Sequence, residues 1–213
     1  MAIGDRSKNI RMNVMQSLKD PSGLGDGQVE IVYDSLNRVQ KRIAEESECL
    51  EDIFNITLIS GQELYTLPSD FLRERMVVPV GGSVAITQIG MDDLARLRLL
   101  QSSGSSSPDI AYYYKWNGQI GFMDANGIAP STSSTITLYY WRYPNIVSEI
   151  MSDTVDPVID QRWDTALFYG ALADINGEDR WESKFGREFA RVMNVERTNQ
   201  SEPGQIPTNR SYD

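Results

Sequence analysis

The chain has 213 residues, 40% of them apolar and 23% charged, a composition typical of a folded protein rather than a disordered one. Thirty acidic residues against twenty basic ones give a formal net charge of −10, which argues against a surface that binds nucleic acid by neutralising phosphates. The chain has no histidine, so Ser-His-Asp and Cys-His catalysis and His-ligated zinc are excluded.

The first 54 residues are expected to be helical. Ile10, Val14 and Leu18 recur at every fourth position, and this short stripe ends at residues 20–23, Asp-Pro-Ser-Gly. A longer helix is predicted to begin after a cap at Asp26. Its apolar residues are spaced three and four apart: Val29, Val32, Tyr33, Leu36, Val39, Ile43 and Leu50. Each helix has one apolar face, so each needs a partner helix.

Residues 55–150 alternate between apolar and polar side chains, which is typical of strands. Residues 55–60 and 63–67, separated by Gly61, are predicted to form a hairpin. Further strands are expected at residues 76–80, 84–89, 110–116, 119–123 and 135–141, with a tight turn at Asn117-Gly118 and a short helix over 90–97. This segment is therefore predicted to be an antiparallel β module with a sheet of about six strands.

Helical spacing returns after Pro144. A helix is expected to begin at Asp156-Pro157, and its small residues would let a neighbouring helix approach closely; they are Ala166, Gly170, Ala171 and Ala173. A last helix starts near Glu178-Asp179, with Trp181, Phe185, Phe189, Val192 and Met193 on one face. The predicted fold is α+β: a small helical bundle built from residues 1–54 and 151–197, an inserted β-rich module at 55–150, and an extended polar tail at 198–213.

Two acidic clusters are the candidates for catalysis. Five carboxylates lie near the end of the second helix and three precede the third: Glu45, Glu46, Glu48, Glu51, Asp52, Asp153, Asp156 and Asp160. Paired carboxylates can hydrolyse glycosidic bonds, and carboxylate oxygens can hold Mg²⁺ or Ca²⁺. We favour a solvated helix face and helix capping, because no Asp-x-Asp-x-Asp-Gly loop is present. No enzyme activity, catalytic residue, cofactor or metal site is predicted.

Aromatic residues are dense in two predicted strands, Tyr112-Tyr113-Tyr114-Lys115-Trp116 and Tyr139-Tyr140-Trp141-Arg142-Tyr143. Side chains alternate along a strand, so both faces carry aromatic surface. Such a platform can stack sugars or single-stranded bases. We favour two packed faces, one against the helical bundle and one against another subunit.

The start of the chain is basic, with Arg6, Lys8, Arg11 and Lys19 against Asp5 alone, whereas residues 20–52 are acidic. This asymmetry favours subunits that meet with opposite charges, and scattered solvated charges are an equal alternative.

Cysteine content and hydropathy indicate the compartment. Cys49 is the single cysteine, which excludes an intramolecular disulfide and favours a reducing compartment. No apolar run approaches the roughly 20 residues that span a bilayer, and Met1–Arg6 lacks the profile of a signal peptide. We expect a soluble protein without a membrane partner.

One stretch is more specific. Tyr65-Thr66-Leu67-Pro68-Ser69-Asp70-Phe71 resembles the Tyr-x-Leu-Pro-x-Asp-Phe signature of head-to-tail adaptor (neck or connector) proteins of tailed bacteriophages. The order of helices, signature, Asn117-Gly118 strand pair and later Trp163 helix also resembles that family over about residues 10–195. The signature residues Tyr65, Leu67, Pro68, Asp70 and Phe71 are expected to be structural, a strand stopped by proline and then a turn in which the Asp70 side chain binds the backbone.

The resemblance implies a virion structural protein. Family members form a ring of identical subunits, usually twelve, which docks beneath the portal protein, joins it to the tail or nozzle protein, and passes double-stranded DNA as non-specific cargo. Assembly would occur in the bacterial host cytoplasm and the ring would lie in the virion neck. The resemblance also implies that the tail at 198–213 contacts the portal. Expected subunit or portal contacts are Trp116, Tyr140, Trp141, Ile206 and Tyr212.

The net negative charge acquires a meaning in that setting. A channel through which DNA slides should not hold phosphates, so acidic groups on the second helix, or near Asp153 and Asp156, are candidates for its lining.

Two other functions stay open from the residues alone. One is a tail-associated glycan hydrolase that uses two carboxylates, and the other is a carbohydrate-binding module that uses the Tyr and Trp platform. Neither accounts for the long helices at both ends of the chain or for the polar tail.

Overall fold

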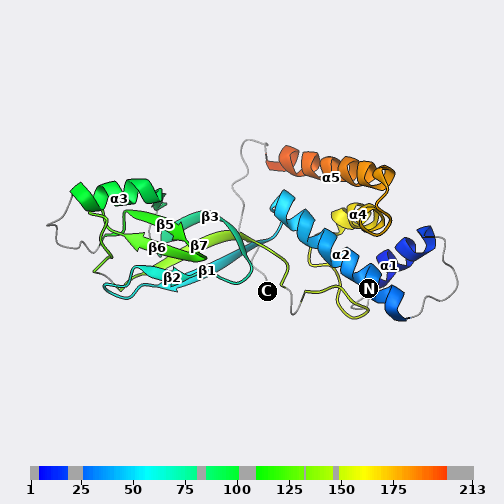
Figure 1. Ribbon diagram of the computed structural model, residues 1–213, viewed down its shortest axis with the longest axis horizontal. Helices are drawn as coiled ribbons and strands as arrows, with labels where there is room; N and C mark the ends of the chain where they lie inside the picture. Colours follow the sequence, from blue (N-terminus) through cyan, green and yellow to red (C-terminus); the bar gives the residue numbers. More distant parts are fainter. Residues whose placement is uncertain are drawn as a thin grey trace. The chain divides into compact units, whose positions relative to one another are not determined.

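The computed structural model describes residues 5–18, 26–80, 85–100, 109–131, 133–145 and 149–200 (Figure 1). It is a mixed α+β structure, as predicted, and it divides into two compact units. The helical unit comprises Met1–Cys49 and Pro144–Asp213, and the sheet unit comprises Leu50–Tyr143. The first and last described helices, Asp5–Ser17 and Asp179–Gln200, therefore both belong to the helical unit.

The helical unit is built around α4. Its elements are α1 (Asp5–Ser17), α2 (Asp26–Ser47), a 3₁₀ turn η1 (Gln161–Trp163), α4 (Asp164–Asn176) and α5 (Asp179–Gln200). α4 contacts α1, α2 and α5, so it is the helix that holds the unit together. The apolar stripes face inward as expected, and Leu36, Ile43, Leu167 and Phe185 are at most 1% exposed.

Gly170 is the point of closest helix packing. A Cβ atom built at Gly170 would lie 2.5 Å from Val39 Cγ1 on α2 and 3.0 Å from Phe185 Cδ2 on α5. Carbon atoms normally approach to about 3.5–4.0 Å, so no larger residue fits without movement. The prediction that small residues on this helix allow close approach is confirmed at Gly170.

The ends of the helices differ from the sequence prediction in three places. α2 ends at Ser47, because Glu48 has a left-handed φ of 56°, and so Leu50 lies outside the helix. The third helical segment begins at η1 rather than at Asp156-Pro157, since the Asp160 side chain caps η1. α5 continues to Gln200, so the expected tail is helical over residues 198–200; no proline or glycine occurs between Gly186 and Pro203.

The sheet unit contains two sheets. The first has the order β1-β7-β3 and is antiparallel, with β1 at Glu51–Thr57, β7 at Thr135–Arg142 and β3 at Phe71–Pro79. The second has the order β2-β6-β5-β4, with β2 at Leu64–Thr66, β6 at Gln119–Met123, β5 at Tyr112–Trp116 and β4 at Thr87–Gln88. β4 runs parallel to β5, so the module is mixed and not wholly antiparallel.

The expected hairpin over 55–67 is wrong. β1 pairs with β7 and β2 pairs with β6, so these two neighbours in sequence belong to different sheets. Alternation identifies a strand and its two faces, but it does not identify the partner strand. The expected tight turn at Asn117-Gly118 is present, since both residues have positive φ and β5 pairs with β6 on either side of it.

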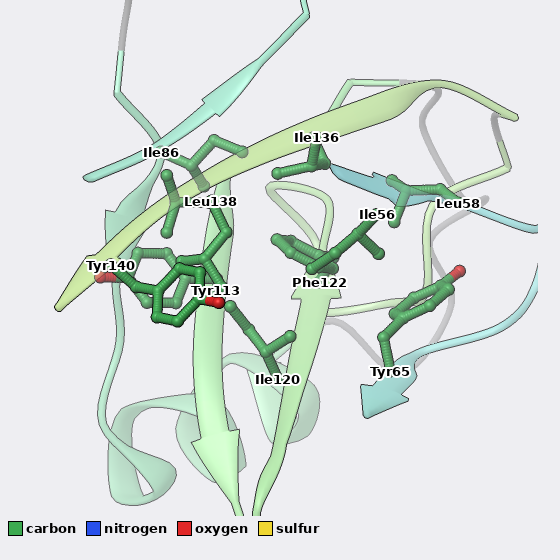
Figure 2. Close-up of a cluster of buried hydrophobic side chains, with 11 residues drawn as sticks. Ile56, Leu58, Tyr65, Ile86, Tyr113, Ile120, Phe122, Ile136, Leu138 and Tyr140 are labelled. Carbon is green, nitrogen blue, oxygen red and sulfur yellow. The ribbon is translucent and has the colours of Figure 1, made fainter. Parts of the chain in front are cut away.

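The inner faces of the two sheets enclose the main core of the sheet unit (Figure 2). Leu138 and Ile136 from β7 meet Phe122 and Ile120 from β6 there, and none of the four is more than 1% exposed. A second cluster joins the other face of the β2-β6-β5-β4 sheet to α3 (Met91–Leu100), through Leu94. The sheet unit therefore has three layers: sheet, sheet and helix.

These layers correct the expected role of the aromatic strands. Tyr113 is buried in the core between the sheets, and Tyr114 is buried beneath α3. Both faces of β5 are thus packed within the sheet unit itself, rather than against the helical bundle and another subunit. The aromatic rings supply apolar area to a small unit that has to form two cores.

Candidate functional site

The signature residue Tyr65 closes the loop that follows β1. Its ring is 8% exposed, and its hydroxyl accepts a hydrogen bond from the Ile59 amide at 2.8 Å and reaches the Gln62 carbonyl at 3.2 Å. Tyr65 also packs against Phe122, with ring centroids 5.9 Å apart. Its role in the structure is to fix the chain between β1 and β2.

The rest of the signature forms the turn into β3. The Phe71 amide donates to the Pro68 carbonyl at 3.1 Å, and the Phe71 ring stacks on Tyr140 at 5.7 Å. The Asp70 carboxylate accepts a hydrogen bond from the Tyr140 hydroxyl at 3.2 Å. The sequence analysis predicted a bond from this side chain to the backbone, and the structure shows a tyrosine as its partner instead. Leu67 packs on the core between the sheets. All five signature residues thus make contacts within the sheet unit.

Tyr140 was expected at a contact surface, and the structure places it inside. It is 4% exposed, and burial together with the charge of Asp70 raises the pKa of its hydroxyl. Alternation on β7 explains the difference, because the side chains on either side of Tyr140 point outward.

The other expected contact residues lie in different places. Trp116 is 56% exposed at the end of β5, and Trp141 is half-buried on β7, with the Arg75 guanidinium 5.4 Å from its ring centre. Ile206 and Tyr212 lie outside the described residues. Trp141 follows Tyr140, which contacts Asp70 and Phe71, whereas Trp116 lies beside the β5–β6 turn.

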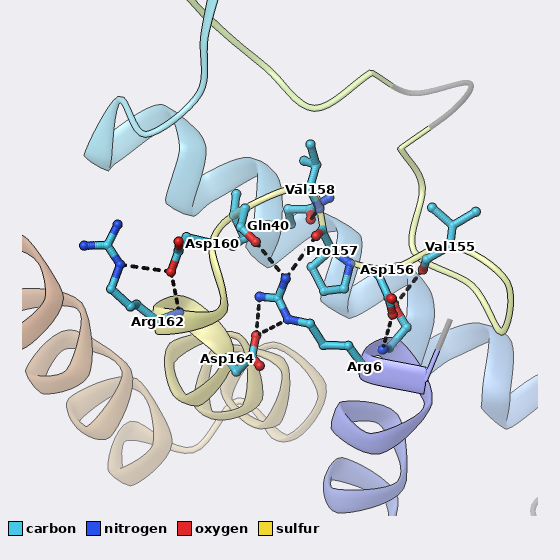
Figure 3. Close-up of polar contacts among 11 residues, drawn as sticks. Arg6, Gln40, Val155, Asp156, Pro157, Val158, Asp160, Arg162 and Asp164 are labelled. Atoms are coloured by element: carbon cyan, nitrogen blue, oxygen red, sulfur yellow. Dashed lines mark hydrogen bonds and ion pairs between the residues drawn. The ribbon is translucent and has the colours of Figure 1, made fainter. Parts of the chain in front are cut away.

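The basic start of the chain is used inside the protomer (Figure 3). Arg6 donates from Nε to Asp164 at 2.8 Å and from Nη1 to the carbonyls of Pro157 and Ile159 at 3.1 and 2.9 Å. The adjacent Ser7 amide donates to Asp156 at 2.9 Å. These bonds tie α1 to the segment that leads into α4, so Arg6 is a structural anchor rather than a charge that faces another subunit.

Acidic groups near α1 are similarly engaged. Asp153 accepts a hydrogen bond from the Tyr33 hydroxyl at 2.6 Å and lies 3.6 Å from Arg11. Burial and this bond raise the pKa of Tyr33. Asp160 caps η1, and its bonds to the backbone amide and then to the side chain of Arg162 lower its pKa. The prediction that the carboxylates before this helix include a cap is confirmed at Asp160.

The acidic cluster near the end of α2 is dispersed by ion pairs. Glu46 pairs with Arg42 at 2.8 Å, and Glu51 pairs with Arg75. Asp52 lies 3.6 Å from Arg142. Within the described ranges, no group of three or more acidic or cysteine side chains could hold a metal ion. Each of these carboxylates balances a positive charge.

The hollows in the described part of the helical unit include two that lie between its helices. The larger, about 420 Å³, is between α1 and α4, and its lining is mostly amide, hydroxyl and aromatic: Arg6, Asn9, Ile10, Asn13, Gln161, Asp164, Thr165, Phe168 and Tyr169. The smaller, about 220 Å³, lies over Gly170 and is bordered by the Arg38–Asp174 and Arg42–Glu182 ion pairs.

Exposed apolar side chains gather on the sheet unit instead. On the outward face of the β1-β7-β3 sheet, Ile53 is 55% and Met76 is 42% exposed, and both pair with Tyr139. On α3, Met91 is 41% and Leu99 is 81% exposed. Exposed apolar patches on otherwise polar proteins mark interaction surfaces. The signal for the α3 patch was present in the four-residue spacing of Met91, Ala95 and Leu99, which the sequence analysis did not use.

The described residues form buried apolar cores and leave apolar patches exposed, which is typical of a protein that works through contacts with other proteins. The model of the SU10 adaptor protein family matches residues 9–207, nearly the whole chain. The chain therefore belongs to this family of phage head-to-tail adaptors, and the resemblance noted at Tyr65–Phe71 is confirmed. No curated protein matches the chain.

Membership in this adaptor family establishes the general function of the protein. The protein is a structural adaptor of a tailed bacteriophage and a component of the virion neck, where it interacts with other neck proteins. Adaptors of this kind are generally not enzymes. Across the residues that the structure describes, no helix has the length and hydropathy needed to cross a membrane.

Proposed function

We propose that the protein assembles as a ring between the portal and the tail or nozzle protein, and that the phage genome leaves through the channel of this ring. The family match supports the adaptor role. The observation that carries the ring is the uncovered apolar surface on the sheet unit, at Ile53, Met76, Met91 and Leu99. Identical subunits in a closed ring would cover it in every copy.

The number of subunits proposed is twelve, as the resemblance implies. Trp116 and Trp141 remain proposed contact residues because both lie at least partly at the surface. Ile206 and Tyr212, in the polar tail at 198–213, are proposed contacts with the portal. A polar segment that orders on binding can follow the surface of a partner without needing a core of its own.

The proposed channel lining is the exposed acidic face of α2. Glu30, Asp34 and Glu45 are exposed there, beside the exposed basic residues Arg38 and Lys41, and Asp153 and Asp156 accept hydrogen bonds from Tyr33 and Ser7. We propose α2 for the lining because three of its carboxylates are exposed, with the region of Asp153 and Asp156 as the alternative. A negative lining repels phosphates and leaves the duplex mobile, since no counterion-releasing contact is made at each step.

The mass of the full-length chain tests the ring. Light scattering is measured for the chain alone and with the portal protein, followed by imaging of the particles. We expect a closed ring on the portal, with the copy number read from the images. A chain that stays monomeric and never joins a portal would refute the adaptor ring.

Charge reversal on α2 tests the channel. Phage carrying Glu30→Lys, Asp34→Lys and Glu45→Lys should assemble rings but release DNA more slowly, because basic groups bind the passing phosphates. The matched control replaces Glu30 and Glu45 with Gln and Asp34 with Asn, which removes charge without adding a positive group and should slow release less. Equal release rates for all three phages would count against an α2 lining.

A further inference from the structure

α3 packs on the β2-β6-β5-β4 sheet by a narrow apolar contact (Figure 1). Among the residues of this helix whose exposure is described, Leu94 is the only buried one, and it clusters with Tyr114 and Met123 of the sheet beneath. Leu97 is half-buried beside Gly127. The opposite side of the helix is exposed, and we call its apolar residues the α3 stripe: Met91, Ala95 and Leu99.

One arginine supplies a polar attachment of α3 to the rest of the sheet unit. Arg98 donates from Nε to the Gly127 carbonyl at 3.1 Å and forms an ion pair through Nη2 with Glu63, just before β2. The Arg98 side chain is 45% and the Glu63 side chain 27% exposed, so water competes for this pair. Arg96 pairs instead with Asp93 of the same helix. The described attachments of α3 are therefore two apolar side chains and one arginine.

The sheet surface beneath α3 has supports of its own. A Cβ built at Gly121 would lie 2.3 Å from the Tyr114 ring, so this ring lies directly against the backbone of β6. The Tyr114 hydroxyl donates to the Glu63 carboxylate, and the Phe122 amide donates to the Glu63 carbonyl at 3.0 Å. None of these contacts involves α3. Tyr114 and Glu63 therefore remain bonded to each other when Arg98 moves away.

The core between the two sheets is also independent of α3 (Figure 2). Its eleven buried residues come from the strands and the segments beside them, whereas α3 contributes Leu94 to a separate cluster of three. Burial of apolar area is the main stabilising contribution to a fold. Removing α3 therefore exposes a small part of the buried area and leaves the larger core intact.

We propose that α3 is a lid, which leaves the sheet as a unit and returns while the two sheets stay folded. Segments with few buried apolar contacts open at a lower free energy than the whole domain unfolds. The open form uncovers an apolar surface centred on Tyr114 and Met123, which are 5% and 0% exposed in the closed form. This surface is bordered by Leu64, Ile89 and Tyr112. The inference concerns a single chain and does not depend on the proposed ring.

The lid controls access to an apolar surface. A permanently exposed apolar patch promotes association of free chains, and a covered one does not. A contact that needs the open form has its apparent affinity reduced by the fraction of chains that are open. The docking of α3 therefore determines how much of this surface the free protein presents.

Hydrogen exchange of the unmodified full chain tests the lid. We expect the amides of α3 to exchange at rates that low concentrations of urea do not change, because local opening exposes little surface. The amides of β6 and β7 should exchange more slowly, and faster as urea is added. If α3 exchanges at the same rate and with the same urea dependence as β7, it opens only when the whole unit unfolds, and the lid is refuted. An α3 without any protection would refute the closed form.

Thiol labelling gives a second measure at the surface beneath the lid. In a Cys49→Ser background, Met123→Cys places a thiol under α3 and Val77→Cys places one in the core between the sheets. Both native side chains are at most 1% exposed. A small disulfide reagent should modify position 123 at least about tenfold faster than position 77, because only position 123 is reached by local opening. Equal labelling rates would contradict the lid.

Two arginine variants test what holds the lid closed. Arg98→Met removes the polar attachment of α3 and should raise the labelling rate of Met123→Cys about fivefold. Arg96→Met is the matched control on the same helix, and it should change this rate less than about twofold. Neither should alter labelling of Val77→Cys, and circular dichroism confirms that all variants fold. Equal effects of the two arginine variants, or faster labelling at both thiol positions together, would overturn the inference.

Discussion

Replacing Gly170 with alanine should loosen the helical unit even though alanine is the better helix former. The new Cβ would lie 2.5 Å from Val39 Cγ1, about 1 Å inside normal contact. Val39 is β-branched and cannot easily rotate away from α4. Overpacking of this kind costs about 1–3 kcal/mol, while alanine in a helix gains about 1 kcal/mol over glycine. The net expectation is a loss of about 1 kcal/mol of unfolding free energy.

Gly186 provides the matched control. It also lies inside a helix, α5, but nothing is within 4 Å of a Cβ built there. Gly186→Ala should therefore stabilise the protein by about 1 kcal/mol from helix propensity alone. The same chemical change at two helical glycines is expected to have opposite signs and to differ by about 2 kcal/mol, which is measured by urea unfolding followed by far-UV circular dichroism.

A third variant isolates the cause. Adding Val39→Ala to Gly170→Ala removes the clashing methyl groups, so the loss in the double variant should be smaller than the sum of the single losses by at least 0.5 kcal/mol. If Gly170→Ala stabilises the protein as much as Gly186→Ala does, the close approach of α2 to α4 does not limit stability and the reasoning fails.

Three further predictions concern single residues. Gly121→Ala should disrupt the layer under α3, because its Cβ would lie 2.3 Å from the Tyr114 ring; loss of α3 protection in hydrogen exchange is the measure, and unchanged protection contradicts it. Arg6→Met should lower the unfolding free energy by about 2 kcal/mol, since Asp164 and two carbonyls lose their donor; a urea midpoint equal to wild type would count against this. Burial, followed by the charge of Glu74, raises the pKa of Tyr113 to about 12. The neutral hydroxyl therefore stabilises the fold fully below pH 10 and loses this effect toward pH 12, so Tyr113→Phe should show a flatter decline in unfolding free energy over that range; identical slopes would exclude it.

Much of the fold could be predicted because it follows from local patterns. The stripe on α2 lies where the spacing of Val32, Leu36 and Ile43 places it, and the turn at Asn117-Gly118 needs the positive φ that these residues tolerate. Gly170 was identified by its size alone. In each case the signal lies within a few residues of sequence, although the side chains that pack on Gly170, Val39 and Phe185, come from other helices.

The parts that could not be predicted depend on partners distant in the chain. β1 pairs with β7, which is some 80 residues away, and no residue in either strand encodes that choice locally. Burial of Tyr140 depends on whether its face of β7 is the inner one, and alternation alone leaves that open. Arg6 bonds to Asp164 and to two nearby carbonyls, all more than 150 residues away in sequence. Counting the charges in each segment does not reveal that these groups meet.

Among the candidate contact residues, too, some could be predicted from the local sequence and others could not. Trp116 was recognisable as a surface residue at the end of an aromatic strand, and it is exposed. The α3 stripe was missed because a short helix with several charges resembles a solvated segment until the buried side, at Leu94, is known. Once that side is fixed, the apolar residues opposite it stand out as uncovered.

The neighbouring positions of β1 and β7 determine how the two halves of the helical unit can meet during folding. The sheet unit separates them as a loop of about 90 residues, and closing a flexible loop of that length costs about 4 kcal/mol of chain entropy. Glu51 pairs with Trp141, and the Arg142 amide donates to the Leu50 carbonyl at 2.9 Å, so the folded sheet unit holds both ends of the loop together. A sheet unit that forms first therefore removes the entropic barrier to docking α2 on α4, and slow pairing of β1 with β7 would delay the whole bundle.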